Sequence, residues 1–330
     1  MRPSLQKVAE RAGVSRMTAS NVMRGREAQT STATRDRVLE AMRELDYVPV
    51  APPSKQNRHV ETRIIALSFD CIDFEDIWGA QLYRGMRQAA RAARYDLLTL
   101  LRLETDQLMN QEEVRFLDRR SDGVIFVLPQ NRNRVLETMT QHRISAVTCC
   151  LESGLDEVPS VVLENEGAMR QATEHLIEKG HRRIVHLMGD AERWDHRMRQ
   201  RGYERAMEAA HLRPLLLQHD EAGQWRQTLD GLIAKGEATA CASFNDDSAL
   251  QLWSHLTQQG LMVPRDFSLV GMDNLPEAQH LGLTTMRFST EEIGRRAVES
   301  LVKMLNGAKP RECSAVVPVE LIERTSVLTR

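Results

Sequence analysis

Short apolar runs rich in β-branched residues alternate with helical stretches from residue 62 onward. The first series reads RIIALSF, DLLTLL, GVIFVL and SAVTC, with helical periodicity near 75–94, 108–118 and 131–142. A second series begins at SVVLEN and continues through RIVHLMG, ATACASF and DFSLVGM. Strands that alternate with helices pair in parallel, because each crossover helix returns the chain to the same end of the sheet. Two such series predict an α/β chain with two mainly parallel sheets, and therefore two lobes.

Length and hydropathy argue against a single small domain and against a membrane protein. The chain has 330 residues, and a soft prior of roughly 150 residues per domain suggests two or three units. No run approaches the roughly 18 consecutive apolar residues that a membrane-spanning helix needs. The first residues, MRPSLQKVAE, lack the apolar segment of a secretory signal. We therefore expect a cytoplasmic protein without a membrane partner.

Charge is divided unevenly along the chain. Residues 1–60 contain 11 Lys and Arg against 6 Asp and Glu, a difference of +5, which leaves −7 for the rest of a chain whose total is −2. Each Lys or Arg that neutralises a phosphate releases counterions, so a small basic module can bind DNA within a slightly acidic protein. Only the first 60 residues suit a polyanion.

The basic region has the pattern of a helix-turn-helix. An apolar stripe at i, i+3, i+4 and i+7 predicts a first helix, which Gly13 ends, with the stripe at Leu5, Val8, Ala9 and Ala12. Ser15 is a natural N-cap for a second helix, whose inward residues are Ala19, Val22 and Met23. Ser31 or Thr32 caps a third helix, whose inward residues are Val38, Leu39, Met42 and Leu45. These stripes predict a three-helix head of about 45 residues.

The second of these helices carries polar residues on its outward face, the face that meets base edges in the major groove in helix-turn-helix proteins. The outward residues are Arg16, Met17, Thr18, Ser20, Asn21 and Arg24, all polar except Met17. Arg16 and Asn21 suit bidentate contacts to guanine and adenine, and Met17 suits an apolar contact with a thymine methyl. The alternative is a solvated polar face on a small helical bundle.

Polar side chains stand at the ends of the expected strands, where ligands bind in open α/β sheets. They are Asp70, Asp122, Glu164, Asn165, Asp190, Asn245, Asp246, Asp273 and Asn274. Carboxylates and amides in such a ring suit a ligand rich in hydroxyl groups, because each accepts several hydrogen bonds. The alternative for any one of them is that it caps the following helix.

The runs LQKVAERAGVSRMTASNVMRG and TSTATRDRVLEAMRELDYVP resemble the DNA-binding head of the lactose-repressor (LacI/GalR) family, and the resemblance continues in ATEHLIEKGHRRIVHLMGD, VPRDFSLVGMDN and ERTS. It implies a helix-turn-helix head at 1–49, a linker at 50–61, and a two-lobed, periplasmic-binding-protein-like effector and dimerisation domain at 62–330. Lobe 1 would span about 62–161 and 290–319, and lobe 2 about 162–289 and 320–330.

The resemblance also implies function and site residues. It predicts a transcriptional regulator, expected to be a repressor, which binds near-palindromic double-stranded operator DNA as a homodimer and responds to a small molecule, expected to be a carbohydrate. The expected DNA-binding residues are Ser4, Ser15, Arg16, Met17, Thr18, Ser20, Asn21, Arg24, Ser31, Thr34, Tyr47, Lys55 and Arg58. The expected effector-binding residues are Phe74, Trp78, Asp122, Arg199, His219, Asn245 and Asp273.

The linker departs from the family pattern. The stretch YVPVAPPSKQNRHV has adjacent prolines and Gln56 where relatives carry a short hinge helix and a leucine that wedges into the minor groove. We therefore expect binding mainly through the major groove, with less bending of DNA than the relatives produce.

Other classes of function have weaker support in the sequence. No GxxxxGK, GxGxxG, HExxH or GxSxG motif indicates an enzyme, and no cofactor or metal is expected. The five cysteines lack CxxC spacing, so they suit small buried side chains better than a metal site. The main alternative function is a two-lobed small-molecule binding protein without a DNA function, and the basic head argues against it.

Overall fold

The structure is a computed structural model, which describes residues 4–23, 31–45, 47, 61–69, 77–101, 116–128, 132–220 and 222–330. Most of the linker and most of the helix predicted at 108–118 lie outside the described residues. The same holds for the predicted site residues Arg24, Lys55, Arg58 and Phe74, and for Asp70. Within the described ranges, no helix is both long and apolar enough to cross a membrane.

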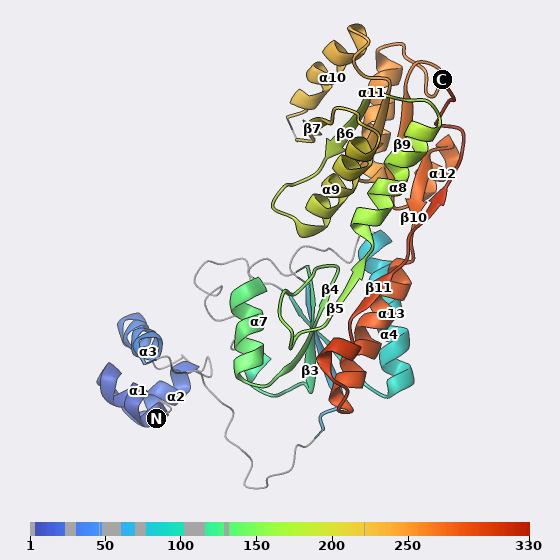
Figure 1. Cartoon of the computed structure of the whole chain (residues 1–330). Coiled ribbons are helices and arrows are strands. Elements are labelled where there is room, and N and C mark those ends of the chain that lie inside the picture. Colours follow the sequence, from blue (N-terminus) through green and yellow to red (C-terminus); the bar gives the residue numbers. More distant parts are fainter. Residues whose placement is uncertain are drawn as a thin grey trace.

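The head consists of three helices, α1 (Leu5–Ala12), α2 (Arg16–Met23) and α3 (Thr32–Glu44) (Figure 1). Gly13 ends α1 in the left-handed region, at φ 64°, which costs a glycine little. The core joins all three helices through Val8, Ala19 and Val38, each with no exposed surface. Leu39 was predicted to point inward, but it is only half-buried and Ala41 fills the core instead. Leu39 lies about 100° around the helix from Val38, so it falls on the flank of the buried stripe.

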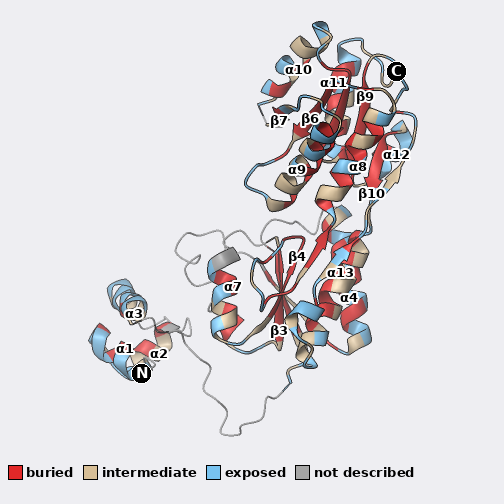
Figure 2. Ribbon diagram, in the orientation of Figure 1, coloured by how far each residue is buried: buried red, intermediate tan, exposed pale blue. Residues whose placement is uncertain are grey.

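Lobe 1 is a six-stranded, all-parallel sheet in the order β11-β5-β4-β3-β1-β2. Its strands are β1 (Ile64–Phe69), β2 (Asp96–Leu101), β3 (Gly123–Val127), β4 (Ser145–Cys149), β5 (Ser160–Leu163) and β11 (Ala315–Val317). Its helices are α4 (Ile77–Ala93), α7 (Arg132–Gln141) and α13 (Thr290–Leu305). All five residues of β3 are buried, as expected for a strand covered on both faces (Figure 2).

Lobe 2 repeats this plan, with the strand order β12-β10-β9-β8-β6-β7, and only β12 runs antiparallel to its neighbour. Its strands are β6 (Ile184–Met188), β7 (Leu215–Gln218), β8 (Ala240–Ser243), β9 (Ser268–Met272), β10 (Thr284–Arg287) and β12 (Glu320–Ile322). Its helices are α8 (Asn165–Glu178), α9 (Trp194–Ala209), α10 (Gln224–Ala234), α11 (Asp246–Gln258) and α12 (Pro276–Leu281). A 3-10 turn, η1 (Pro310–Glu312), precedes β11. The predicted fold class, two mainly parallel sheets behind a helical head, is confirmed.

The chain passes between the two lobes three times, after β5, after β10 and between β11 and β12. The sequence had placed SVVL at the start of the second series. The structure puts this strand, β5, in the first sheet instead, where it pairs with β4 and β11, so the first crossing follows Leu163. One apolar core cluster continues through the crossings and includes residues of both lobes, such as Val147 of β4, Met169 of α8 and Met286 of β10.

Each lobe has one pair of helices that cross in close contact, α4 with α13 and α8 with α9 (Figure 1). Glycines permit the approach. A methyl group at Gly85 would collide with the Glu291 carbonyl, one at Gly294 with the Leu82 carbonyl, and one at Gly202 with the Glu166 carbonyl. These crossings hold the helices against the sheets whose ends carry the candidate effector site.

Candidate nucleic-acid interface and effector site

The first turn of α2 presents its side chains to solvent. Met17 is 73% exposed, which is unusual for a large apolar residue, and Arg16 beside it is also exposed. Thr18, Ser20 and Asn21 are half-buried. Because Ala19 and Val22 fill the core from the opposite face of α2, the exposed residues contribute little to the fold. The structure therefore brings five of the predicted base-contacting residues onto one short helix.

Three predicted DNA-binding serines have local roles in the head. Ser4, Ser15 and Ser31 each accept a hydrogen bond from a backbone N–H three residues later, at 3.3, 3.0 and 3.3 Å. Thr34 donates or accepts a further hydrogen bond with Ser31, at 2.9 Å. These contacts start the three helices, and all three serines remain exposed at the surface. An exposed cap is compatible with a phosphate contact at the same helix end.

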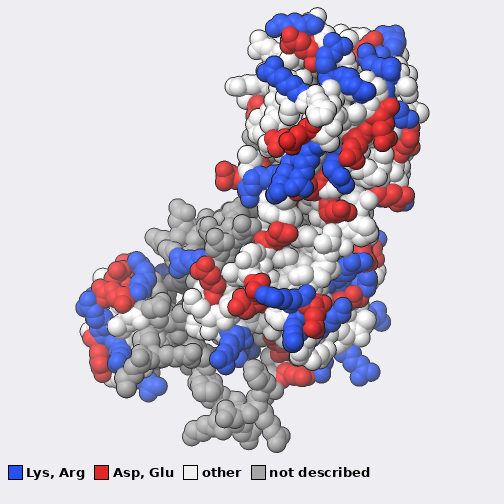
Figure 3. All heavy atoms as spheres, in the orientation of Figure 1, with Lys and Arg blue, Asp and Glu red and all other residues white. Residues whose placement is uncertain are grey.

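Tyr47 packs against the core of the head and is half-buried. Burial raises the pKa of its phenol, and the positive charge of Arg16 lowers it in part. An ion pair of 2.6 Å between Arg11 and Glu44 joins α1 to the end of α3. Positive and negative side chains are interspersed over the face of the molecule that Figure 3 shows.

Lobe 2 gathers a buried polar cluster at the carboxyl ends of its strands, with Arg199 of α9 as its cation. Arg199 is only 6% exposed. Its Nε donates to Asn165 Oδ1 at 2.9 Å, and its Nη1 donates to the Phe244 carbonyl at 2.6 Å. These partners come from the starts of α8 and α11, so Arg199 ties three elements together. Asn165 was predicted only as one of the polar residues at strand ends.

Two aspartates balance this cation. Burial raises the pKa of Asp273, which follows β9, to about 7, while Arg199 opposes the rise and Asp246 adds to it. Asp195, in the first turn of α9, has a lowered pKa. Burial alone would raise it, but the charges of Arg199 and Arg193 prevail. Arg193 donates to both Asp195 oxygens, at 3.1 and 2.8 Å. This pairing leaves Arg193 and Asp195 mutually neutralised beside Arg199.

Asp246, at the start of α11, is a further buried acid of the cluster, and its charge acts on Asp273. Its carboxylate accepts from Thr285 Oγ1 at 2.6 Å and from the Leu275 backbone N–H at 2.9 Å, and it has no exposed surface. Burial raises its pKa, whereas these hydrogen bonds lower it. The side-chain oxygen of Asn245 caps α11 by accepting from the Ser248 backbone at 2.9 Å. Asn245 therefore has the capping contact that was considered as an alternative to ligand binding.

The prediction that Asp122 binds the effector is wrong. It was predicted to follow a strand, but it immediately precedes β3 and so lies at the opposite, amino-terminal end of the sheet. Its carboxylate accepts from the Thr62 backbone at 2.7 Å, from Thr62 Oγ1 at 2.8 Å and from the Arg63 backbone at 2.9 Å. These bonds fix the start of β1. In a parallel sheet the two ends are far apart, so Asp122 leaves the candidate effector set.

The remaining predicted effector residues border the cluster. His219, just after β7, stacks on Trp225 with ring centroids 5.6 Å apart and contacts Gln251 at 3.1 Å. Its edge approaches Phe244, at 5.8 Å between centroids. Trp78, in the first turn of α4, is half-buried and packs against the core that both lobes share. Asp195 was not among the predicted effector residues. It could have been found from the sequence, since it lies one helical turn before Arg199.

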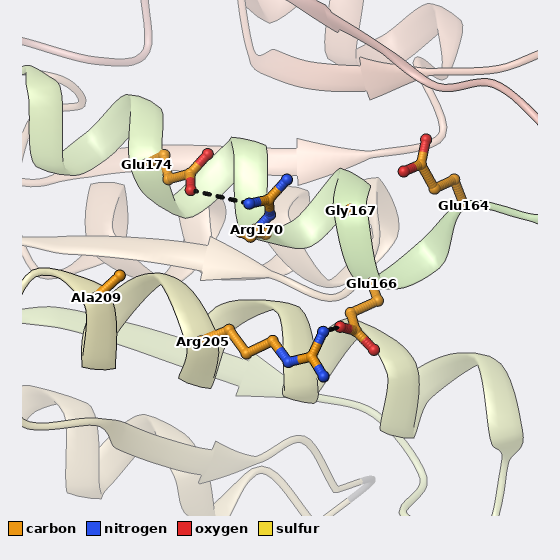
Figure 4. A pocket seen from close by; sticks show the side chains of 7 residues that line it. All are labelled: Glu164, Glu166, Gly167, Arg170, Glu174, Arg205 and Ala209. Carbon is orange, nitrogen blue, oxygen red and sulfur yellow. Dashed lines mark hydrogen bonds and ion pairs between the residues drawn. The ribbon is translucent and has the colours of Figure 1, made fainter.

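A hollow of about 540 Å³ on lobe 2 lies elsewhere, between α8 and α9 (Figure 4). Ion pairs line it, one between Arg170 and Glu174 at 3.8 Å and one between Arg205 and Glu166. Both arginines of the lining are already paired with glutamates, so we do not assign the hollow to the effector. Among the described residues, no group of three or more His, Cys, Asp or Glu side chains is arranged to hold a metal ion.

Comparisons with known proteins match both parts of the chain. Residues 4–50 match the family of bacterial regulatory proteins named after lacI, and residues 173–327 match the periplasmic binding protein-like domain. The "HTH-type transcriptional repressor PurR" of Aliivibrio fischeri (strain MJ11) is 29% identical over 341 residues, covering 99% of each protein. The "HTH-type transcriptional regulator RegA" of Clostridium saccharobutylicum is 29% identical over 342 residues, covering 99% of this chain and 100% of RegA.

Solved structures agree in fold. The complex of the regulator CelR with cellobiose superimposes with a TM-score of 0.72, at 26% identity over 98% of this chain and all of that one. The lac repressor dimer bound to operator and the anti-inducer ONPF gives a TM-score of 0.67, at 23% identity over 99% and 100%. These relatives are regulators, so the prediction that the chain is not an enzyme is confirmed. The chain therefore combines a DNA-binding head of the lacI family of bacterial regulatory proteins with a periplasmic binding protein-like domain.

Proposed function

We propose that this regulator binds a near-palindromic operator as a homodimer through α2, and that a carbohydrate bound between the lobes changes its affinity for DNA. The observation that carries the proposal is that one chain combines an exposed α2 face with a buried polar cluster at strand ends. A symmetric dimer would present two heads to the two halves of the operator. The effector acts only to the extent that it binds the two closure states of the lobes with different affinities.

The chemistry of the polar cluster supports a carbohydrate. Arg199 supplies N–H donors, and Asp195 and Asp273 supply carboxylate oxygens, a combination that matches hydroxyl groups able both to donate and to accept. His219 offers an aromatic ring at the border of the cluster. A related regulator was solved with cellobiose. A purine is the competing ligand class, because other relatives carry the name PurR.

Calorimetric titration with a panel of mono- and disaccharides and a matched panel of purine bases tests the ligand class. The proposal expects at least one saturable saccharide and a clear loss of its affinity in the Asp273→Asn variant. Replacing exposed Arg213 by Gln provides a control, which keeps the affinity. Binding of purines and of no saccharide would refute the carbohydrate assignment.

Binding to heparin and to mixed-sequence DNA separates this proposal from a ligand carrier without DNA function. A regulator of this kind loses affinity steeply as salt rises, because phosphate contacts release counterions. A Lys7→Gln variant reduces the slope if the exposed Lys7 makes such a contact. A protein that binds neither heparin nor DNA at low salt would contradict the DNA-binding function and favour a ligand carrier.

A further inference from the structure

Two adjacent cysteines lie at the carboxyl end of β4. Cys149 is the last residue of the strand, and Cys150 follows it with φ 67°, in the left-handed region. Their sulfur atoms are 3.7 Å apart, and the side chains are 0% and 7% exposed. No part of the proposed function uses this pair of thiols. Elsewhere among the described cysteines, Cys241 lies in β8 and Cys313 after η1, and each is buried without a second thiol beside it.

The dithiol lies where the two lobes meet. The carboxyl end of β4 points toward lobe 2 (Figure 1). The same core cluster contains both cysteines together with Ala168 and Met169 of α8. Asp195 and Arg193, at the start of α9, are the charged groups that act on the Cys150 thiol. Lobe 2 therefore covers the dithiol in this arrangement, and a relative movement of the lobes changes its exposure.

Adjacent cysteines are poorly suited to a disulfide. Neighbouring Cα atoms are about 3.8 Å apart across a trans peptide, whereas disulfides usually join Cα atoms about 4.4–6.8 Å apart. A strained disulfide of this kind is easily reduced, so the pair persists as two thiols. A bridging atom between the sulfurs enlarges the ring and relieves the strain. Zinc is a poor candidate, because it takes four ligands and no third ligand group is placed here among the described residues.

We propose that Cys149 and Cys150 form a dithiol site for trivalent arsenicals, and that an occupied site holds the two lobes apart. A monosubstituted arsenical oxide condenses with both thiols. Two As–S bonds form, the arsenic–oxygen bond breaks, and the oxygen leaves as water with the two thiol protons. No electrons are transferred, so no oxidant is needed. The hydrogen bond with Cys149, and burial after it, raise the pKa of Cys150, which keeps it as the protonated thiol that this condensation consumes.

The occupied site bears on regulation because of its position. An organic group on arsenic needs room that the buried junction does not offer, so the adduct favours the separated arrangement of the lobes. Through linkage, it opposes any ligand that favours closure. This regulatory consequence rests on the proposed function, whereas the formation of the adduct does not.

The test treats the full-length protein with phenylarsine oxide and measures intact mass under native conditions. We expect one phenylarsenic group per chain, which survives excess β-mercaptoethanol and is removed by 2,3-dimercaptopropanol. Cys149→Ala and Cys150→Ala each abolish this stable adduct. Cys313→Ala and Cys71→Ala keep it. Circular dichroism melts verify that each variant is folded, and Cys149→Ser and Cys150→Ser replace any alanine variant that is not.

The outcomes separate the two proposals. A stable adduct that persists without Cys149 or Cys150, or that disappears in Cys71→Ala, overturns the assignment of the site. Small-angle scattering then compares free and modified protein, and an unchanged radius of gyration overturns the claim that the lobes are held apart. If no stable adduct forms but a saccharide still binds, the dithiol site is refuted and the proposed effector is unaffected. A stable adduct in a protein that binds no saccharide leaves the dithiol site standing and counts against the proposed effector.

Discussion

Arg199 determines the electrostatics of the candidate effector site at the scale of single residues. Its guanidinium bonds Asn165 and the Phe244 carbonyl, and its charge is felt by both Asp195 and Asp273. A buried cation with several anionic neighbours cannot be replaced by an apolar group without leaving negative charge unbalanced. The same residue is therefore expected to affect both folding stability and ligand binding.

Replacing Arg199 by Met is expected to lower the free energy of unfolding by roughly 3–5 kcal/mol, the usual cost of removing one partner from a buried charge cluster. Urea denaturation followed by circular dichroism measures the loss. Arg201→Met, on the exposed side of the same helix, is the matched control and changes stability by less than about 1 kcal/mol. Equal losses in the two variants would contradict the role assigned to Arg199.

Three histidines, of which His181 and His186 are buried and His196 is half-buried, make stability depend on pH. Burial lowers the pKa values of His181, His186 and His196 from 6.5 to about 4. Below pH 6.5 the unfolded chain binds protons at these sites before the folded chain does, so stability is lost as the pH falls from 6.5 toward 4. Asp273 acts in the opposite sense. Because its pKa is raised to about 7, its contribution is present at low pH and lost as the pH rises through 7.

The net expectation is a fall in the free energy of unfolding from pH 6.5 toward pH 4, since the three histidines outnumber the two aspartates with raised pKa values, Asp246 and Asp273. Urea titrations across this range measure it. The His186→Phe variant has a shallower dependence, because one buried group no longer takes up a proton on unfolding. His211→Gln, at an exposed position, keeps the slope of the parent protein. A slope that His186→Phe leaves unchanged would show that His186 does not contribute.

Arg16 and Met17 are expected to affect DNA recognition without affecting the fold. Arg16→Ala lowers operator affinity by about 1–3 kcal/mol and relaxes specificity at one base pair of each half-site. Met17→Gln changes the preferred base at a neighbouring position. Fluorescence anisotropy on single-base operator variants measures both effects, and thermal melts verify the fold. Loss of affinity that is uniform over all sequences would assign Arg16 to a phosphate instead.

Residue roles were predictable where they are local. Ser15 was predicted as an N-cap and Ser31 as one of two candidates for the next cap, and both accept the capping hydrogen bond. Asp122 was assigned wrongly, because its role depends on which side of β3 it occupies and on Thr62, 60 residues away. The role of Asp195 depends on the charges of Arg199 and Arg193 beside it. A sequence shows that charged residues are present but not which of them pair.

At the scale of elements, the helix contacts at glycine leave no room for a larger side chain. The backbones of α4 and α13 meet at Gly85 and Gly294, and those of α8 and α9 meet at Gly202. At each of these positions the colliding atom belongs to backbone, which cannot rotate away as a side chain does. Apolar periodicity predicted the helix near 75–94, but it did not show that α13, more than 200 residues later, would pack against it.

Gly85→Ala is expected to destabilise the protein by about 1–3 kcal/mol, the range typical of overpacking. Gly231→Ala, inside α10 and facing open space, is the matched control. It should stabilise by about 0.5–1 kcal/mol, because alanine favours the helix. Paired urea denaturation curves measure the difference. A stabilising Gly85→Ala would mean that α4 and α13 are not in backbone contact.

Elements whose partners are distant in sequence were the hardest to assign. β5 was given to the second series because SVVL is apolar and precedes a helix, and either sheet accepts such a strand. Its neighbour β11 lies about 150 residues further along the chain, so the sequence could not show that β5 completes the first sheet. Most strands inside each series were predicted, since their order along the chain already specifies parallel βαβ units. The short edge strand β7, Leu215–Gln218, was missed.

At the scale of the whole molecule, three crossing segments connect two lobes that carry the two halves of the candidate site. Lobe 2 supplies Arg199 and Asp273 and lobe 1 supplies Trp78, so the proposed ligand between them would act on the relative position of the lobes. The expectation of weak DNA bending depends on residues 50–60, outside the described part of the chain, and stays a prediction. A circular-permutation assay that shows a strong central kink would contradict it.

The central claim is that the chain is a dimeric, sequence-specific DNA-binding regulator. Selection of random duplexes by the purified full-length protein, sequenced after binding at two salt concentrations, tests it most directly. The account predicts a two-fold symmetric site, recovered at both salt concentrations, with half-sites at a fixed spacing. Salt-sensitive binding that enriches no sequence would contradict it.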